Sequence, residues 1–283
     1  MKISIITVCY NSNGTIAHTI ESVLAQDFPG IEYLIIDGAS SDNTVAIAES
    51  YRRKFAEKGI PYTVRSEPDK GIYDAMNKGV LLASGDVVGI LNSDDRYATS
   101  DVLSAVADCF EKNNADSIYG NLLYVKNGKP YRYWKSGKRK SFRKGWMPPH
   151  PAFFVKKSVY EKYGVFRLDC GINADYEIML RFLEVHKISS VWLDKICTYM
   201  EAGGTSNNGF QSRLVAMSND RLAWEKNGIK QGMLTIFLKK LRKLPQFIGA
   251  KIYMTQFKNI QWGGGVQQCS KMTFVRTPLQ EAA

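Results

Sequence analysis

The sequence predicts an α/β protein with a mostly parallel central sheet flanked by helices. Two features carry this prediction: short, continuous apolar runs recur at strand length, and each is followed by a segment with apolar residues at helical spacing. Strands that alternate with helices in this way form parallel sheets with right-handed crossovers. The 283 residues are enough to bury a core and to carry a cleft.

The expected elements follow in order along the first part of the chain. The run at 3–8 (ISIITV) predicts a central strand, and the pattern at 16–24 predicts the first helix, with Ser12 or Asn13 as its cap. Further strands are expected at 33–36, 62–65 and 87–91, and further helices at 44–58 and 72–83. The loops after the strands are rich in Asp, Ser, Asn and Gly, so we expect a ligand site at this edge of the sheet.

The formal net charge of +11 implies an anionic partner, such as a phosphorylated substrate, anionic lipid or nucleic acid. Much of the charge lies at 135–144 and 239–251, where the alternative is a solvated basic face. A hairpin signal at 127–128 precedes aromatic residues at 131–134, which could stack on sugar rings or on bases. No nucleic-acid-binding motif accompanies them, so we expect no nucleic acid partner.

Two adjacent carboxylates, Asp94 and Asp95, follow the apolar run at 87–91. Carboxylate oxygens at a strand end suit Mg²⁺ or Mn²⁺, which complete their coordination with water and substrate phosphates. This placement predicts a metal-bound ligand that carries phosphate. The alternative is a turn in which these residues, with Asn92 and Ser93, only cap the next helix.

Five motifs occur in order: TVCYN from Thr7, DGASSDNT from Asp37, DKGIYDAMNKG from Asp69, SGD from Ser84 and LNSDD from Leu91. Together they resemble the inverting family 2 glycosyltransferases, similar to those of bacterial exopolysaccharide and colanic acid synthesis. The resemblance covers roughly residues 1–200. It implies a GT-A fold, with a Rossmann-like nucleotide-binding half and an acceptor-binding half. It also implies transfer from a nucleotide-sugar, expected to be a UDP-sugar, to a hydroxyl of a glycan or polyprenyl-diphosphate-linked acceptor in cell-surface polysaccharide synthesis.

The resemblance assigns residues on the donor side. Those implied to contact the nucleotide-sugar are Thr7, Val8, Tyr10, Asp37, Lys70, Asn77 and Asp94. Asp37 would accept from the base edge, and Asp94 would face the ribose or the metal. For Lys70 the alternative is a solvated loop lysine, and for Asn77 a turn or cap residue.

The metal ligand implied by the resemblance is Asp95, joined by Asp94 and His150, and the ion would be Mn²⁺ or Mg²⁺. Asn92 stands where the family's D-x-D motif begins with aspartate. His150 lies in the Pro-flanked stretch MPPHPAFF, and the resemblance suggests contact with diphosphate, metal or acceptor. The alternative is a loop histidine held by packing.

An inverting transfer needs a second carboxylate to take the proton from the acceptor hydroxyl. Asp175 lies in the first turn of a predicted helix, where the helix dipole favours its anionic form. In the family the base is the aspartate of a Glu-Asp pair followed by an arginine. Here Asp175 and Arg181 match, whereas Ala174 replaces the glutamate, and Glu177 is a weaker substitute for the base. The alternative is that Asp175 is only a helix cap.

The expected organisation is a transferase domain at 1–205, divided into a nucleotide-sugar-binding half at 1–120 and an acceptor half at 121–205, then a helical extension at 206–262 and a loose tail at 263–283. In the extension, Leu234, Phe237, Leu238 and Leu241 alternate with cations in a short amphipathic helix that ends before Pro245. Such a helix can lie on an anionic membrane surface and approach a lipid-linked acceptor. Alternatively, it packs on the transferase domain with a solvated basic face.

No signal-peptide core and no run of about 18 apolar residues occurs, and the five cysteines are widely spaced. We therefore expect a cytoplasmic enzyme, peripheral at most on the inner face of the cell membrane. A sugar nucleotidyltransferase is the alternative enzyme, but residues 9–14 (CYNSNG) lack the basic phosphate loop of that class. A non-enzymatic module that binds nucleotide-sugar or nucleic acid stays open because of Ala174.

Overall fold

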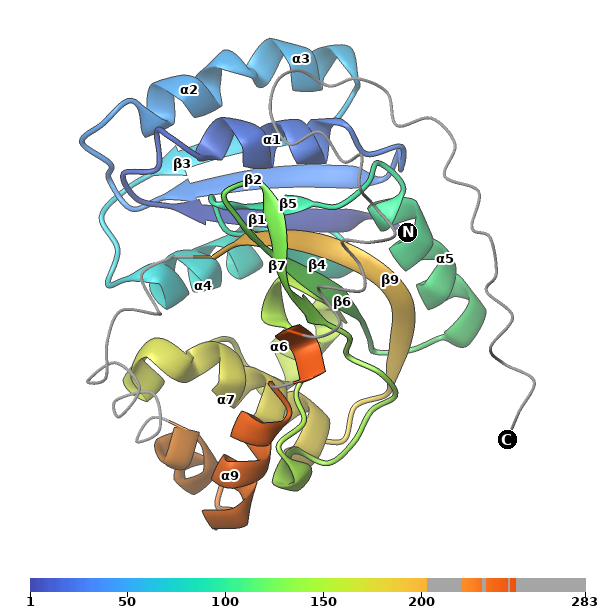
Figure 1. Cartoon of the computed structure of the whole chain (residues 1–283). Coiled ribbons are helices and arrows are strands. Elements are labelled where there is room, and N and C mark those ends of the chain that lie inside the picture. Colours follow the sequence, from blue (N-terminus) through green and yellow to red (C-terminus); the bar gives the residue numbers. More distant parts are fainter. Residues whose placement is uncertain (203–219, 231–232, 244, 248–283) are drawn as a thin grey trace.

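The computed structural model describes residues 1–202, 220–230, 233–243 and 245–247. Within them, a nine-stranded sheet has the order β3-β2-β1-β4-β8-β6-β9-β5, with β7 paired to β6 (Figure 1). The strands are β1 (Ile3–Cys9), β2 (Ile31–Asp37), β3 (Tyr62–Ser66), β4 (Val87–Ile90), β5 (Asp95–Tyr97), β6 (Ser117–Lys126), β7 (Lys129–Trp134), β8 (Phe153–Lys156) and β9 (Ser190–Glu201).

The helices lie on both faces of this sheet. They are α1 (Ile16–Leu24), α2 (Thr44–Ser50), α3 (Arg52–Glu57), α4 (Ile72–Leu82), α5 (Val102–Asn113), α6 (Lys157–Tyr163), α7 (Ala174–Leu180) and α9 (Met233–Leu241), with short turns η1 (Phe142–Lys144), η2 (His150–Ala152), η3 (Leu168–Asn173) and η4 (Arg181–Val185). In Figure 1, α1 to α3 cover one face and α4 the other. The expected α/β architecture is confirmed.

The parallel part of the sheet lies in the first half of the chain. β1 pairs in parallel with β2 and β4, and β2 pairs in parallel with β3. The second half adds antiparallel pairs, of β8 with β4 and β6, β7 with β6, and β5 with β9, while β6 and β9 are parallel. The hairpin between β6 and β7 turns at Asn127 and Gly128, both with positive φ, as the Asn-Gly signal predicts.

Alternation along β1 divides the core in two. Ile5 packs on one face of the sheet with Ile20 of α1, and Ile6 packs on the other with Met76 of α4. Successive strand side chains point to opposite faces, so a strand covered on both sides is buried throughout and mostly apolar. All of Ile3–Cys9 is buried, and its two polar side chains, Ser4 and Thr7, form hydrogen bonds inside the protein, to Glu32 and Tyr33.

The expected helix at 44–58 is two helices, α2 and α3, which meet at Tyr51. Tyr51 is buried, and its hydroxyl donates to Glu21 of α1 at 2.9 Å. A straight helical pattern does not reveal this break, because the position is fixed by the contact with α1.

The basic helix α9 packs on η1. A Cβ atom on Gly145, whose φ is +69°, would overlap the backbone of Leu238 and Lys239. Thr235 Oγ1 donates to the carbonyl of Arg143 at 3.0 Å. None of the described helices has both the length and the apolarity needed to cross a bilayer. The predicted tail at 263–283 lies outside the described residues, and the predicted domain boundaries stay predictions.

Candidate active site

The acidic turn, residues 92–95, connects β4 to β5. The N–H of Asp95 donates to the carbonyl of Asn92 at 3.0 Å, and Asp95 then begins a strand. Since the next helix begins only at Val102, the interpretation that these carboxylates cap a helix is wrong. The turn is instead held by the α1 region: Thr19 Oγ1 donates to the carbonyl of Asp95 at 2.6 Å.

Ser12 also binds this turn. The first helix was expected to be capped by the side chain of Ser12 or Asn13, yet its N-cap is Thr15, with no side-chain cap bond. The Ser12 carbonyl accepts from the N–H of Thr15, while its hydroxyl lies 2.8 Å from the hydroxyl of Ser93. The loop after β1 is therefore bonded to the acidic turn.

The two aspartates of the turn differ in exposure. Asp95 is 1% exposed; its Oδ2 accepts from Asn92 Nδ2 at 3.3 Å, and its Oδ1 is buried without a hydrogen-bond partner among the described residues. Burial and the neighbouring charge of Asp94 raise the pKa of Asp95 well above its usual range. Asp94 is exposed to solvent, but its carboxylate is partly desolvated, and this raises the pKa of Asp94 as well.

A divalent cation fits this pair. A buried carboxylate oxygen without a donor, next to a second carboxylate, is stabilised by a bound cation. Asp94 and Asp95 line a hollow of about 190 Å³ together with His18, Arg96 and Glu201. Within the described ranges no three His, Cys, Asp or Glu side chains gather as a metal site, so water and substrate phosphate would supply the other ligands.

At the end of β1, the predicted donor-site residues face different ways. Thr7 and Val8 are buried, and Thr7 Oγ1 accepts from the hydroxyl of Tyr33 at 3.0 Å. Tyr10 is 64% exposed at the edge where the loops meet. The ring of Tyr10 is therefore open to a ligand, whereas Thr7 and Val8 could reach one only through their backbone.

Asp37 ends β2 with a fully buried carboxylate. It accepts from the Ser40 N–H at 2.9 Å, from the Ser40 hydroxyl at 2.5 Å and from the Ser66 hydroxyl at 2.6 Å. Cys9 Sγ lies 3.5 Å away, and burial together with the Asp37 charge raises the pKa of that thiol. These bonds show how Asp37 holds its own loop; its contact with a base stays a prediction.

Lys70 lies two residues before α4, and Asn77 lies within it. The Lys70 side chain is exposed, and the backbone N–H of Lys70 donates to Asp74 Oδ2 at 3.0 Å. The Asn77 amide donates to the Phe166 carbonyl at 2.9 Å and accepts from the Phe166 N–H at 2.8 Å. Asn77 thus joins α4 to the chain before η3, and its part in donor binding stays a prediction.

Asp175 lies in the first turn of α7, half-buried, while Asn173 holds the N-cap position. Asp175 Oδ1 accepts from the Tyr176 N–H at 2.8 Å. The hydroxyl of Tyr73, from α4, lies 3.2 Å from the same Oδ1 and 2.9 Å from the Ile172 carbonyl, and its single proton serves one of them at a time.

His150 lies on the acceptor side, near Asp175. Burial lowers the pKa of His150, and the charge of Asp175 opposes that shift. The imidazole packs edge-on against Phe166, with ring centroids 5.6 Å apart. The structure thus brings His150 and Asp175 together, and metal binding by His150 stays a prediction.

Tyr124 of β6 lies near the acidic turn and was not singled out from the sequence: Tyr124 and Asp95 are both aligned with Met200 of β9. Burial raises the pKa of Tyr124, the charge of Arg132 opposes this rise, and the charges of Asp95 and Asp175 add to it. The guanidinium of Arg132 lies over the ring of Tyr124, 3.8 Å from the centroid.

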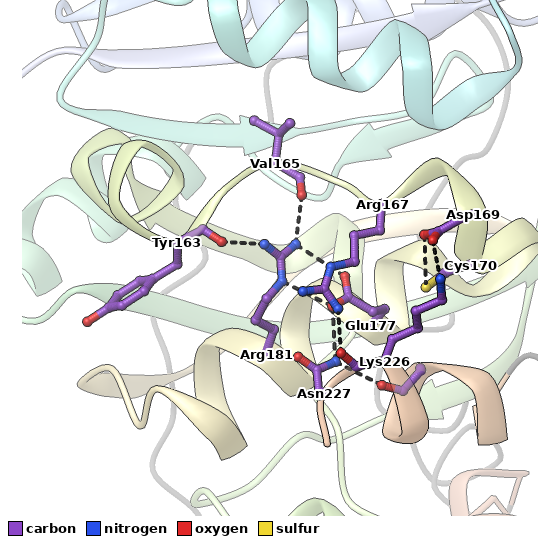
Figure 2. Close-up of polar contacts among 10 residues, drawn as sticks. Tyr163, Val165, Arg167, Asp169, Cys170, Glu177, Arg181, Lys226 and Asn227 are labelled. Carbon is purple, nitrogen blue, oxygen red and sulfur yellow. Dashed lines mark hydrogen bonds and ion pairs between the residues drawn. The ribbon is translucent and has the colours of Figure 1, made fainter. Parts of the chain in front are cut away.

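A buried ion pair fixes the helix that carries Asp175 (Figure 2). Glu177 is fully buried, and its oxygens accept from Arg181 Nε at 3.0 Å and Nη2 at 3.1 Å. Arg181 Nη2 also donates to the Val165 carbonyl at 2.7 Å, and Asn227 Nδ2 donates to Glu177 at 3.0 Å. Glu177 cannot reach an acceptor, so the interpretation of Glu177 as a substitute base is wrong.

Comparison with known proteins decides the family. Residues 4–169 match the family described as Glycosyl transferase family 2. The chain belongs to this family. This family 2 glycosyltransferase is 35% identical over 190 residues to an uncharacterized glycosyltransferase of Mycobacterium tuberculosis. The match covers 63% of this chain and 68% of that relative. The chain is 27% identical over 206 residues to the PGL/p-HBAD biosynthesis glycosyltransferase of Mycobacterium bovis, covering 72% of this chain and 78% of that protein.

Solved glycosyltransferases share the fold. A structure of S. aureus TarS in complex with UDP-GlcNAc matches with a TM-score of 0.57 and 20% identity, over 88% of this chain and 79% of that chain. The mannosyltransferase PcManGT from Pyrobaculum calidifontis, in complex with GDP-Man and Mn²⁺, matches with a TM-score of 0.62 and 16% identity, over 92% and 76%. The expected GT-A fold is confirmed for this family 2 glycosyltransferase.

Proposed function

We propose that this glycosyltransferase is an inverting enzyme that moves a sugar from a UDP-sugar to a hydroxyl of a glycan or polyprenyl-diphosphate-linked acceptor, for cell-surface polysaccharide. The observation that carries the proposal is the acidic turn, where Asp95 Oδ1 is buried without a partner among the described residues and Asp94 lines the same hollow. A carboxylate pair suited to a cation and a separate carboxylate suited to a base, Asp175, are the two groups that a metal-assisted inverting transfer requires. The TarS complex with UDP-GlcNAc supports a nucleotide-sugar donor.

On the donor side, Asp94 and Asp95 would hold Mn²⁺ or Mg²⁺, and the buried Asp95 Oδ1 without a partner among the described residues supports this role. The bound ion would supply neutralisation of the charge that develops on the leaving diphosphate. Mn²⁺ in the PcManGT complex supports the choice of metal. Tyr10 would stack on the nucleobase and Lys70 would contact phosphate, and the exposure of both side chains supports these roles.

On the acceptor side, Asp175 takes the proton from the attacking hydroxyl. Tyr176 N–H and the Tyr73 hydroxyl both engage Oδ1, so we assign proton abstraction to Oδ2. The Glu177–Arg181 pair holds α7, and thereby Asp175, in place. His150, which packs against Phe166, would position the acceptor or the diphosphate.

The test is Asp175→Asn. Sugar transfer and donor hydrolysis are measured with UDP-, GDP- and dTDP-sugars, with and without Mn²⁺. We expect D175N to lower transfer about 10²–10⁴-fold because the general base is lost. Donor affinity should stay the same, because the donor side is untouched. Asp108→Asn, at an exposed position of α5, is the matched control. A D175N enzyme that transfers sugar at the full rate would rule out the assigned base.

A further inference from the structure

A second cavity, of about 400 Å³, lies between β7 and the residues at and after the end of α9. Its volume is within the range of about 300–1,000 Å³ that is usual for small-molecule sites. No Asp or Glu of the described chain lines it. Five of its lining residues are cations: Arg132, Lys135, Lys239, Arg242 and Lys243. Lys135 at the edge of the first basic stretch, Arg132 just before it and three cations of the second stretch therefore meet around one cavity, which suits an anionic ligand.

The charge of this wall is only partly neutralised. Lys135 pairs with Asp194 at 3.2 Å and Lys239 with Asp220 at 2.7 Å, and both carboxylates lie outside the lining. Among the described residues no carboxylate lies at ion-pair distance from Arg132 or Arg242. Arg242 Nε donates to a backbone carbonyl at 2.8 Å. A net positive charge therefore remains in the wall.

Hydrogen-bonding atoms without partners gather at the same place. In the described part of the chain four buried side-chain polar atoms lack a partner: Asn92 Oδ1 and Asp95 Oδ1 in the acidic turn, and Arg132 Nε and Gln246 Oε1 in this wall. Such atoms are costly unless a ligand or water completes them. The donor of Arg132 suits a phosphate oxygen, and the acceptor of Gln246 suits a hydroxyl. A phosphorylated sugar offers both.

The cavity lies next to the acceptor side of the active site. Arg132 in one wall stacks on Tyr124 of β6. From the opposite wall, Lys239 Nζ lies 3.8 Å from the ring centroid of Tyr176, the residue after Asp175. Trp134, also in the lining, offers a ring on which a sugar can stack.

We propose that this cavity is the acceptor's phosphate subsite: it binds the phosphate or diphosphate group that links the acceptor glycan to its carrier, and Arg132 is the principal donor. The proposal rests on the proposed glycosyl transfer and names the acceptor class as an anionic, phosphate-linked glycan. Binding there requires no metal, in contrast to the donor diphosphate.

The test measures binding of inorganic diphosphate to the full chain in EDTA by isothermal titration calorimetry. Arg132→Met removes the charged donor and keeps most of the side-chain volume; we expect affinity to fall about tenfold or more. Arg242→Gln, a second variant in the opposite wall, should weaken binding also. Lys126→Gln, a cation on the neighbouring strand β6 and outside the lining, should bind as the wild type does. Equal affinity in R132M, R242Q and wild type would overturn the proposal, as would an equal loss in K126Q.

Two further measurements identify the source of the phosphate and distinguish failure of this subsite from failure of the proposed function. Farnesyl diphosphate should compete with inorganic diphosphate in wild type, and vesicles of phosphatidylglycerol should not; competition by the vesicles alone would overturn the proposal in favour of a lipid headgroup site. Donor hydrolysis in Mn²⁺ is measured in wild type and in K126Q, where it should be the same. If wild type hydrolyses no nucleotide-sugar, the proposed function fails, whereas normal hydrolysis without diphosphate binding in EDTA refutes this subsite alone.

Discussion

Asp95 is a carboxylate that the fold buries without neutralising it. Since burial and Asp94 raise its pKa above the ordinary value of 3.8, the folded state binds this proton more tightly than the unfolded chain does. The stabilisation from protonated Asp95 is complete below the ordinary pKa and is lost as the pH rises through the raised one. Ionised Asp95 therefore costs stability at neutral pH.

Asp95→Asn should for that reason raise Tm at pH 7 in EDTA, by roughly 2–4 °C for each kcal/mol regained, and change it little below about pH 4. Thermal unfolding at both pH values measures the effect, with D108N as control. Added Mn²⁺ should stabilise wild type by about 2.7 kcal/mol at 100 times its Kd, and D95N much less. A lower Tm for D95N at pH 7 in EDTA would contradict the account.

Single residues also show what the sequence could tell about the site. The acidic turn and Asp175 were found because a strand end and a helix start fix their positions locally. Tyr73 lay inside a recognised motif, but its contact with Asp175 spans about a hundred residues of sequence. Likewise, nothing local indicates that Asn77 binds the backbone of Phe166. Residue type predicts chemistry, whereas tertiary contacts decide which atoms stay available for it.

Helix α7 depends on the Glu177–Arg181 pair for its orientation. Glu177→Gln would leave Arg181 buried without its counter-charge, so we expect a loss of about 3–5 kcal/mol in the free energy of unfolding. Glu225→Gln breaks an i,i+4 pair with Arg221 that is exposed, and should cost little. Urea denaturation of both variants measures the difference. Similar losses in the two would show that the buried pair does not hold α7.

Docking of α9 depends on Gly145. Gly145→Ala would both strain a positive φ and force a Cβ atom against the α9 backbone. Gly137 has a φ of +65°, and no described atom lies within 4 Å of the Cβ that alanine would add there, so Gly137→Ala is the matched control for strain alone. Hydrogen exchange at Met233–Leu241 should become faster in G145A than in G137A. Equal exchange in both variants would mean that α9 is held by other contacts.

Elements formed by local pattern were predicted well, and those formed by distant pairing were not. The four parallel strands of the first half appear at the expected places, within one or two residues at each end. The three-residue strand β5 has no pattern of its own, because it exists only through its pairing with β9. For the same reason, the sequence indicated two basic stretches but not that Lys135 and Arg132 line one cavity with cations of the second stretch.

For the whole molecule, the excess positive charge and the exposed apolar residues of α9 support attachment to an anionic membrane surface. Phe237 is 59% exposed and Leu241, one turn on, is 42% exposed, while Leu238 is half-buried. One side of the helix packs on η1, as the packing alternative expects, and the other leaves apolar side chains exposed; binding of the helix to a membrane stays a prediction. The side chain of Leu234 lies outside the described residues.

Sedimentation with phosphatidylglycerol vesicles measures this attachment. Phe237→Ser combined with Leu241→Ser should lower the bound fraction several-fold, because each buried apolar side chain contributes about 1.5–3 kcal/mol. Leu81→Ser, at a 72% exposed position of α4, is the control. Salt of about 1 M should release the wild type, since screening there acts within about 3 Å. Wild type that stays in the supernatant at low salt would exclude attachment.

The pairing of β5 with β9 limits how this enzyme can be recombined. Asp95 is aligned with Met200, so the backbone that orients the acidic turn comes from a strand about a hundred residues later. A chimera that imports residues 1–120 of a relative to change the donor would separate Asp95 from the strand with which it evolved. A chimera made to exchange donor specificity should therefore carry β9 of the relative together with its residues 1–120, with fusion points on both sides of β9.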